Sequence, residues 1–199
     1  MAIGDLDASR DDPNRSRDRD RWIGVYIGLL AVVLAICSMG GDNAAKDATL
    51  RNIEATNIWS FFQAKNMRRQ LVRTHAEDLE LVLETTPGLT ETQIERIKKR
   101  LAESKSLDAR LTSDPKSNEG LDELFKRGKM LESMRDLALA RDPYFDYGQA
   151  LLQIAIVLAS IAIIAGGSFL LVMSVLLGSA GALLTLNGFL LLFSVPGLA

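Results

Sequence analysis

Residues 147–199 form a run of 53 positions without Asp, Glu, Lys, Arg or His. A soluble core helix is neither this long nor this uniformly apolar, whereas a helix that crosses about 30 Å of hydrocarbon needs roughly 20 apolar residues. The run therefore has room for two crossings. Gly166, Gly167 and Ser168 mark the break between them, because adjacent glycines weaken a helix and permit a tight turn. We expect a membrane hairpin with helices at 149–165 and 169–193.

A third apolar stretch occupies residues 22–39. It carries no charge, and Trp22 and Tyr26 lie where aromatic side chains gather at a membrane interface. A cleaved signal peptide is the alternative, but signal cores run about 7–15 residues and end at small residues. We expect an uncleaved transmembrane helix, preceded by a charged tail at 1–21 that buries too little surface to be ordered.

Residues 42–146 predict an extramembrane helical domain. Breaks are expected at Gly40–Asn43, Thr86–Gly88, Ser113–Gly120 and Asp142–Pro143, which leaves helices at about 44–84, 90–111 and 121–141. Thr90 and Gln93 fit a capping box. The first helix is about 60 Å long and the other two together about 65 Å, at 1.5 Å per residue. This match favours an antiparallel helical stalk; a compact bundle is the alternative.

An apolar or small stripe runs along the first of these helices at helical spacing. Its positions are Leu50, Ile53, Asn57, Phe61, Ala64, Arg68, Leu71, His75, Leu79 and Val82. The whole pattern predicts an all-α integral membrane protein with three transmembrane helices and a helical stalk or hairpin between the first and second.

Composition and motifs exclude several functions. The 23 basic and 25 acidic residues nearly balance, so the chain lacks the basic face that nucleic acid requires. The single histidine, His75, makes a poor metal site alone, and the single cysteine, Cys37, cannot form an intrachain disulfide. No phosphate-binding loop or dinucleotide fingerprint is present. We expect no catalytic activity and no cofactor.

One candidate binding surface combines aromatic and basic residues in a short helical stretch. Its members are Trp59, Phe61, Phe62, Lys65, Arg68 and Arg69. The functional interpretation is a surface for a protein partner or for lipid headgroups. The alternative is a helix core with a solvated basic flank.

Small residues recur in all three crossings at alternating spacings of four and three. They are Gly24, Gly28, Ala31, Ala35 and Ser38 in the first, Ala155, Ala159, Ala162 and Gly166 in the second, and Ser174, Gly178, Gly181, Thr185 and Gly188 in the third. Small residues let helix backbones approach closely, which drives association in lipid. The two helices of the hairpin can pair their small faces with each other, and the first crossing adds a third such face. We expect at least one of the three to meet another chain, in a homo-oligomer or a larger membrane complex. The alternative is that all three small faces pack against other helices of the same chain.

Three amides lie within or near the expected crossings: Gln149, Gln153 and Asn187. We interpret them as hydrogen-bonding groups between helices, each worth about 0.6 kcal/mol. A polar site or a permeation path is the alternative.

Residues 57–65, Asn-Ile-Trp-Ser-Phe-Phe-Gln-Ala-Lys, followed by Met67 and residues 68–71, resemble the W-x-[YF]-[YF]-Q-A-K segment of a bacterial family catalogued as domain of unknown function 4337. Residues 152–155, Leu-Gln-Ile-Ala, resemble the start of its hairpin. The resemblance covers about residues 22–190 and implies three crossings. It implies no active-site residues. The sequence departs from the family at the hairpin turn, where relatives place basic residues.

Charge around the first crossing predicts the orientation. Five arginines precede residue 22, and basic residues stay cytoplasmic. We expect a multi-pass protein of the bacterial inner membrane with a cytoplasmic amino terminus and residues 42–146 outside; Arg135 and Arg141 argue the other way. The expected function is a membrane-anchored helical scaffold or accessory subunit. A small oligomeric channel is the alternative.

Overall fold

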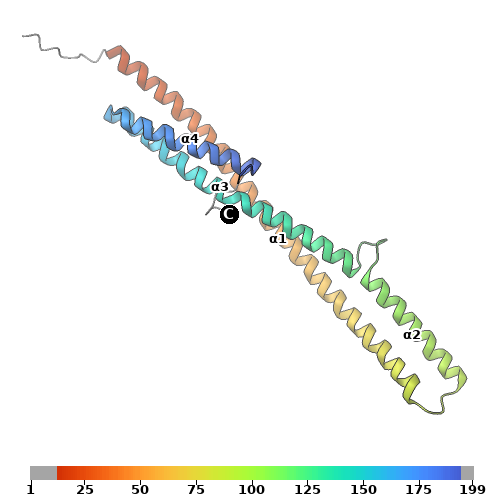
Figure 1. Ribbon diagram of the computed structural model, residues 1–199. Coiled ribbons are helices and arrows are strands. Elements are labelled where there is room, and N and C mark those ends of the chain that lie inside the picture. Colours follow the sequence, from red (N-terminus) through yellow and green to blue (C-terminus); the bar gives the residue numbers. More distant parts are fainter. Residues whose placement is uncertain (1–12, 194–199) are drawn as a thin grey trace, which may run out of the picture. The chain divides into compact units, whose positions relative to one another are not determined.

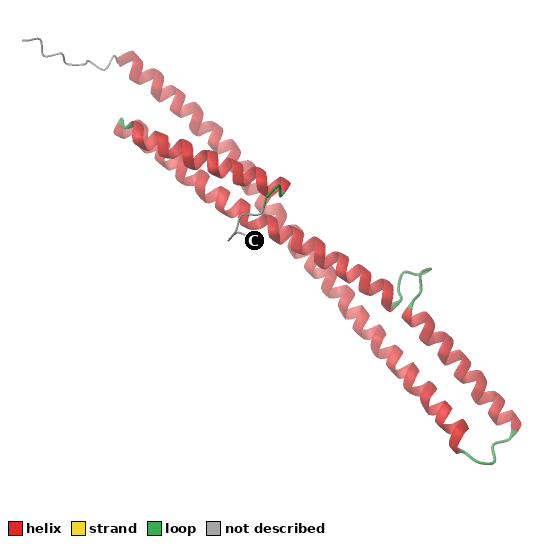
Figure 2. Cartoon of the chain, viewed as in Figure 1, coloured by secondary structure: helices red, strands yellow, loops and turns green. Residues whose placement is uncertain are grey.

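The computed structural model describes residues 13–193, and this range is built from helices alone. The helices are α1 (Pro13–Thr85), α2 (Glu91–Thr112), α3 (Leu121–Ala165) and α4 (Ser168–Leu190), joined by short loops (Figures 1 and 2). The predicted all-α class is confirmed. Three of these helices, α1, α3 and α4, contain a stretch long and apolar enough to cross a membrane.

The helices end where local backbone chemistry predicts. α1 stops at Thr85, and Gly88 in the following turn adopts a φ of +79°. The predicted capping box is present at the start of α2, where Gln93 accepts a hydrogen bond of 2.9 Å from the backbone N–H of Thr90. α3 stops at Ala165, and Gly166 has a φ of +67°, a conformation that favours glycine.

Two expected breaks are absent. α1 continues through Gly40 and Gly41, where a Cβ at Gly40 would lie 2.5 Å from the ring of Phe145, so this glycine provides room for close packing. α3 continues through Pro143, although an internal proline costs a helix about 3 kcal/mol. Burial of Tyr144 and Phe145, each 2% exposed, offsets this cost.

The expected tail also differs from the structure. Residues 13–21 are the first turns of α1, while residues 1–12 lie outside the described range. A helix that continues from an apolar segment needs no new nucleus, so polar residues at its end can remain helical.

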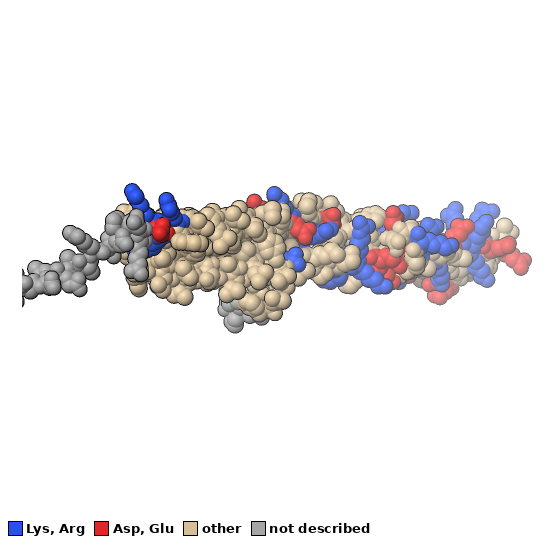
Figure 3. All heavy atoms as spheres, turned by 90° about the horizontal axis from the view of Figure 1, so that it is seen from above, with Lys and Arg blue, Asp and Glu red and all other residues tan. Residues whose placement is uncertain are grey.

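The helices contribute to two compact units. The apolar unit comprises the described residues of Met1–Lys46 and Ala138–Ala199, and the charged unit comprises Asp47–Leu137. On the face drawn in Figure 3, Lys, Arg, Asp and Glu gather over the charged unit. The core of the apolar unit joins α1 to α3 through Leu30, Cys37, Ala44, Phe145, Leu152 and Ala155.

The charged unit is a helical hairpin in which α1 runs antiparallel to α2. The ion pairs Arg73–Asp108 (3.0 Å) and Lys105–Glu80 (2.6 Å) show the opposed directions, because residue numbers rise along one helix as they fall along the other. The first part of α3 also packs on α1. The buried hydrophobic residues of this unit are Ala48, Ala55, Leu111, Leu121, Leu124 and Leu131.

Candidate functional site

The aromatic part of the predicted surface lies largely between helices. Trp59 on α1 is half-buried and contacts Phe125 of α3 edge-on, with ring centroids 5.6 Å apart. Phe62 makes a second edge-on contact with Trp59 at the same distance. α1 and α3 lie so close together here that a Cβ on Gly128 of α3 would be 2.9 Å from the indole of Trp59. Only Phe61, 43% exposed, is open to a partner.

Two of the three basic members are also engaged within the chain. Lys65 makes an ion pair of 3.8 Å with Glu119, and its ammonium lies 5.4 Å from the centroid of the Phe61 ring. Arg69 pairs with Asp108 at 3.2 Å. Arg68 is exposed and shares a face of α1 with Phe61, seven residues before it, whereas Trp59, Phe62 and Arg69 are turned toward other helices. The structure therefore does not bring all six predicted residues to one open surface.

Carboxylates stabilise the joints of the charged unit. Glu123 accepts hydrogen bonds from the hydroxyl of Ser113 (2.8 Å) and the backbone N–H of Asp114 (3.1 Å), and these bonds lower its pKa. Lys129 donates to Glu132 at 2.8 Å, which is the main cause of the lowered pKa of that carboxyl group. These shifts come from exposed structural contacts and do not mark a catalytic group.

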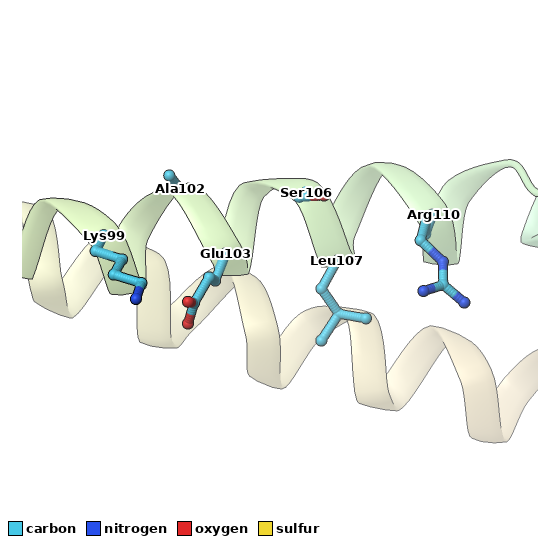
Figure 4. A pocket seen from close by; sticks show the side chains of 6 residues that line it. All are labelled: Lys99, Ala102, Glu103, Ser106, Leu107 and Arg110. Carbon is cyan, nitrogen blue, oxygen red and sulfur yellow. The ribbon is translucent and has the colours of Figure 1, made fainter.

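Shallow grooves follow α2. Lys99, Ala102, Glu103, Ser106, Leu107 and Arg110 line the first. Figure 4 shows Leu107 pointing toward the neighbouring helix, while Ala102 lies on the opposite side of α2. A second groove, between α1 and α2, is lined by Arg68, Leu71, Val72, His75, Arg100, Glu103, Ser104 and Leu107. Both are open surfaces that suit a helix better than a small molecule.

The small residues of α3 and α4 are buried in the apolar unit. Ala155, Ala159 and Ala162 of α3 are at most 1% exposed. The buried residues of α4 are Ser174, Gly178, Gly181, Thr185, Asn187 and Gly188. The hydroxyl of Ser174 donates to the carbonyl of Ala155 at 2.6 Å, and a Cβ at Gly181 would lie 2.9 Å from the carbonyl oxygen of Gly148. The two helices thus meet backbone to backbone.

The small residues near the start of α1 are arranged differently. α1 packs into the apolar unit through Ile23, Leu30 and Cys37, which recur every seven residues. Gly24 and Gly28 are exposed, and a Cβ at either would meet no atom within 4 Å. Ala31 and Ala35 continue this exposed face. We call these four residues the α1 small face.

The three amides do not converge. Asn187 is buried, and its side chain both donates to and accepts from the backbone of Phe193, at 2.8 and 3.2 Å. Gln149 is half-buried and Gln153 is exposed. Asn187 therefore closes the end of α4, where Leu191 adopts a φ of +48°.

Residues 13–193 contain no group of three His, Cys, Asp or Glu side chains that could hold a metal ion. His75 is exposed, and Cys37 is fully buried with its thiol donating to the carbonyl of Phe145 at 3.3 Å.

Several partners were not predicted. Tyr26 donates from α1 to the backbone carbonyl of Ser174 in α4 at 3.0 Å, and Glu132 accepts from Trp59 at 2.9 Å. The two residues of each pair are 148 and 73 positions apart in the sequence, so the periodicity of a single helix could not predict these contacts.

The chain is similar to a known protein family. No curated protein and no solved structure matches the chain. The model of a family described as a domain of unknown function, DUF4337, matches residues 19–191. This range takes in all three apolar segments and the whole charged unit. The chain belongs to the DUF4337 family.

Proposed function

We propose that the protein is a membrane-anchored helical scaffold that assembles with copies of itself through the α1 small face. The observation that carries this proposal is the contrast between the small residues of α1 and those of α4. Neighbouring helices pack directly against Gly178 and Gly181 of α4, whereas a Cβ added at Gly24 or Gly28 would meet no atom within 4 Å. In lipid, a face of small residues gains packing only when another helix approaches it.

Gln153 supports the same proposal. It is exposed on α3 in the apolar unit, where a side-chain amide facing hydrocarbon would lose hydrogen bonds. Polar residues in membrane helices usually face other helices or a water-filled cavity. A neighbouring subunit would supply such a contact.

The apolar unit also suggests an orientation. Arg19 donates to the carbonyl of Gly166 at 3.1 Å, so the arginine-rich start of α1 lies at the hairpin turn. The turn has no basic residue of its own, and α1 supplies one. We infer that this end of the unit faces the cytoplasm of a bacterium and that the charged unit lies outside the inner membrane.

Native mass spectrometry of the full chain, extracted in mild detergent, tests the assembly. The wild type should run as an oligomer, and Gly24→Leu combined with Gly28→Leu should shift it to monomer. The matched control is Ala150→Leu with Ser179→Leu, which adds the same side chains at two other exposed positions of the apolar unit and should leave the oligomer intact.

A monomeric wild type, or equal loss of oligomer in both double variants, contradicts the proposal. Planar-bilayer recordings separate the scaffold from a channel. A scaffold gives no conductance, whereas unitary currents abolished by Gln153→Leu would favour the channel.

A further inference from the structure

One face of α1 within the charged unit is exposed and carries no charge. Residues 50–74 include six charged side chains, but none of them lies at eight exposed positions that are spaced alternately by three and four residues. These positions, which we call the α1 heptad face, are Leu50, Ile53, Asn57, Ser60, Ala64, Met67, Leu71 and Thr74. Leu50, Met67 and Leu71 are 59%, 65% and 67% exposed. An uncharged row of such side chains on an otherwise charged unit indicates a surface that another protein covers.

The spacing of this face is that of a coiled coil. Leu50, Asn57, Ala64 and Leu71 fall at the a positions of a seven-residue repeat, and Ile53, Ser60, Met67 and Thr74 fall at its d positions. A single Asn at an a position fixes the register of a coiled coil, because its amide is best satisfied opposite the same residue of the neighbouring helix. Asn57 is exposed at such a position, so the partner that suits this face best is a second copy of the chain.

We propose that a second copy packs along the α1 heptad face in parallel and in register, so that the two α1 helices form a coiled coil. α1 is one continuous helix from Pro13 to Thr85, and copies that insert into one bilayer with the same orientation run it in the same direction. A two-fold axis then sets Asn57 opposite Asn57 of the second copy, and Met67 opposite Met67 of the second copy.

The residues that flank the face fit this parallel register. In a parallel coiled coil, the g residue of one helix faces the e residue five positions later in the other, and these pairs decide which partners and orientations are tolerated. Gln63 thus faces Arg68 of the second copy, and Gln70 faces His75 of the second copy. Two like charges do not meet at either pair, so the flanks do not oppose the contact.

The α1 heptad face and the α1 small face share the periodicity of one helix. The four residues of the α1 small face precede Ser60, Ala64, Met67 and Leu71 by 36 residues each, and this interval makes about ten turns of an α-helix. One neighbouring α1 can therefore contact both sets. The inference rests on the self-assembly proposed above and deepens it, because it extends the contact into the charged unit and fixes its direction and register.

Cysteine cross-linking of the full chain in a Cys37→Ala background tests the register. Ser60→Cys alone should form disulfide dimers on mild oxidation, because the two sulfur atoms face each other across the two-fold axis. Ser133→Cys, at an exposed site of α3 in the same unit, is the matched control and should give little dimer. Dimer formation by Ser60→Cys that does not exceed that of the control overturns the proposal.

A mixture of two variants tests the direction. Copies carrying Ser60→Cys and copies carrying Met67→Cys should cross-link with each other less readily than Ser60→Cys cross-links with itself, because one heptad separates the two sites in a parallel pair. In an antiparallel pair centred on Ala64 the two sites would instead face each other. A mixture that cross-links more readily than either variant alone overturns the parallel arrangement.

An added charge tests the packing. Met67→Asp sets two carboxylates against each other and should weaken self-association about tenfold. Met130→Asp makes the same change at a methionine of α3 that is 52% exposed, and it should leave association unchanged. Equal effects of the two substitutions, or no effect of Met67→Asp, overturn the coiled coil.

Native mass spectrometry separates this inference from the self-assembly on which it rests. A wild type that runs as a monomer overturns both. An oligomer that is lost in the variant with Gly24→Leu and Gly28→Leu, but that yields no Ser60→Cys cross-link, overturns only the coiled coil.

Discussion

The indole N–H of Trp59 in α1 donates a hydrogen bond of 2.9 Å to Oε1 of Glu132 in α3. Lys129 donates to the other oxygen of the same carboxylate and also lies 5.8 Å from the centroid of the indole ring. The tryptophan of the family-like segment thus joins two helices through its ring and its polar edge. Its role in this chain is helix packing, with little surface left for a partner.

Replacing Trp59 by Phe should destabilise the charged unit. The substitution removes the hydrogen bond to Glu132 and part of the ring contact with Phe125, and the midpoint of thermal unfolding should fall by roughly 2–4 °C, as for a loss of about 1 kcal/mol in a chain of this size. Circular dichroism of the full chain in detergent measures the midpoint. Trp22→Phe is the control, because Trp22 is 75% exposed. Equal shifts in the two variants would contradict the packing role.

Gly181→Ala should destabilise the apolar unit although alanine is the better helix former. The new methyl group would lie 2.9 Å from the backbone carbonyl of Gly148 and 2.9 Å from Cγ of Leu152, and neither can move without displacing α3. We expect a loss of about 1–3 kcal/mol, the usual cost of overpacking. Titration with a denaturing detergent, followed by helical content, compares this variant with Gly24→Ala, whose methyl group meets nothing within 4 Å. A variant at Gly181 that is as stable as the one at Gly24 would disprove the close contact.

Most of the helices could be predicted, because their ends depend on local chemistry. The turn at Pro87 and Gly88, the capping box at Thr90 and the break at Gly166 act within a few residues. The breaks predicted at Gly40 and Pro143 were wrong because they too relied on local chemistry alone. As isolated residues they disfavour a helix, but the ring of Phe145, 105 residues from Gly40, fills the space that the glycine leaves. Tertiary packing overrides propensity at such positions.

Which face of a helix is buried was harder to predict than the helix itself. The regular stripe through Phe61 and Leu71 is exposed, and α1 instead packs through Ala48, Ala55 and Trp59. Both stripes have helical spacing, so periodicity alone cannot choose between them. A helix that carries two such stripes has more apolar surface than one hairpin can cover.

Low pH should remove a stabilising contact at the joint between α2 and α3. Hydrogen bonds from Ser113 and Asp114 lower the pKa of Glu123 from its ordinary value of 4.5. A carboxyl group whose pKa is lowered by folding stabilises the fold fully above its ordinary pKa, and this contribution disappears as the pH falls through the lowered value. Glu123→Gln should therefore be less stable than wild type at pH 7, and this difference should shrink as the pH falls below 4.5.

Thermal unfolding at pH 7, 4.5 and 3 measures this convergence. Asp122→Asn is the matched control, because Asp122 is the exposed neighbour in the same first turn of α3. If the difference in unfolding midpoint between wild type and Glu123→Gln is the same at all three values of pH, this explanation of the Glu123 contact is wrong.

The orientation predicts opposite labelling of two exposed serines. Ser106 of α2 lies in the charged unit and Ser168 begins α4 at the hairpin turn. In a Cys37→Ala background, a membrane-impermeant maleimide should label Ser106→Cys in intact spheroplasts and should label Ser168→Cys only after lysis. Arg19 at the hairpin turn is the physical reason, since it adds a basic side chain to an otherwise neutral loop. Protection of Ser106→Cys together with labelling of Ser168→Cys before lysis would reverse the orientation. The charged unit would then face the cytoplasm, and so would Arg141, which follows it before the second apolar segment.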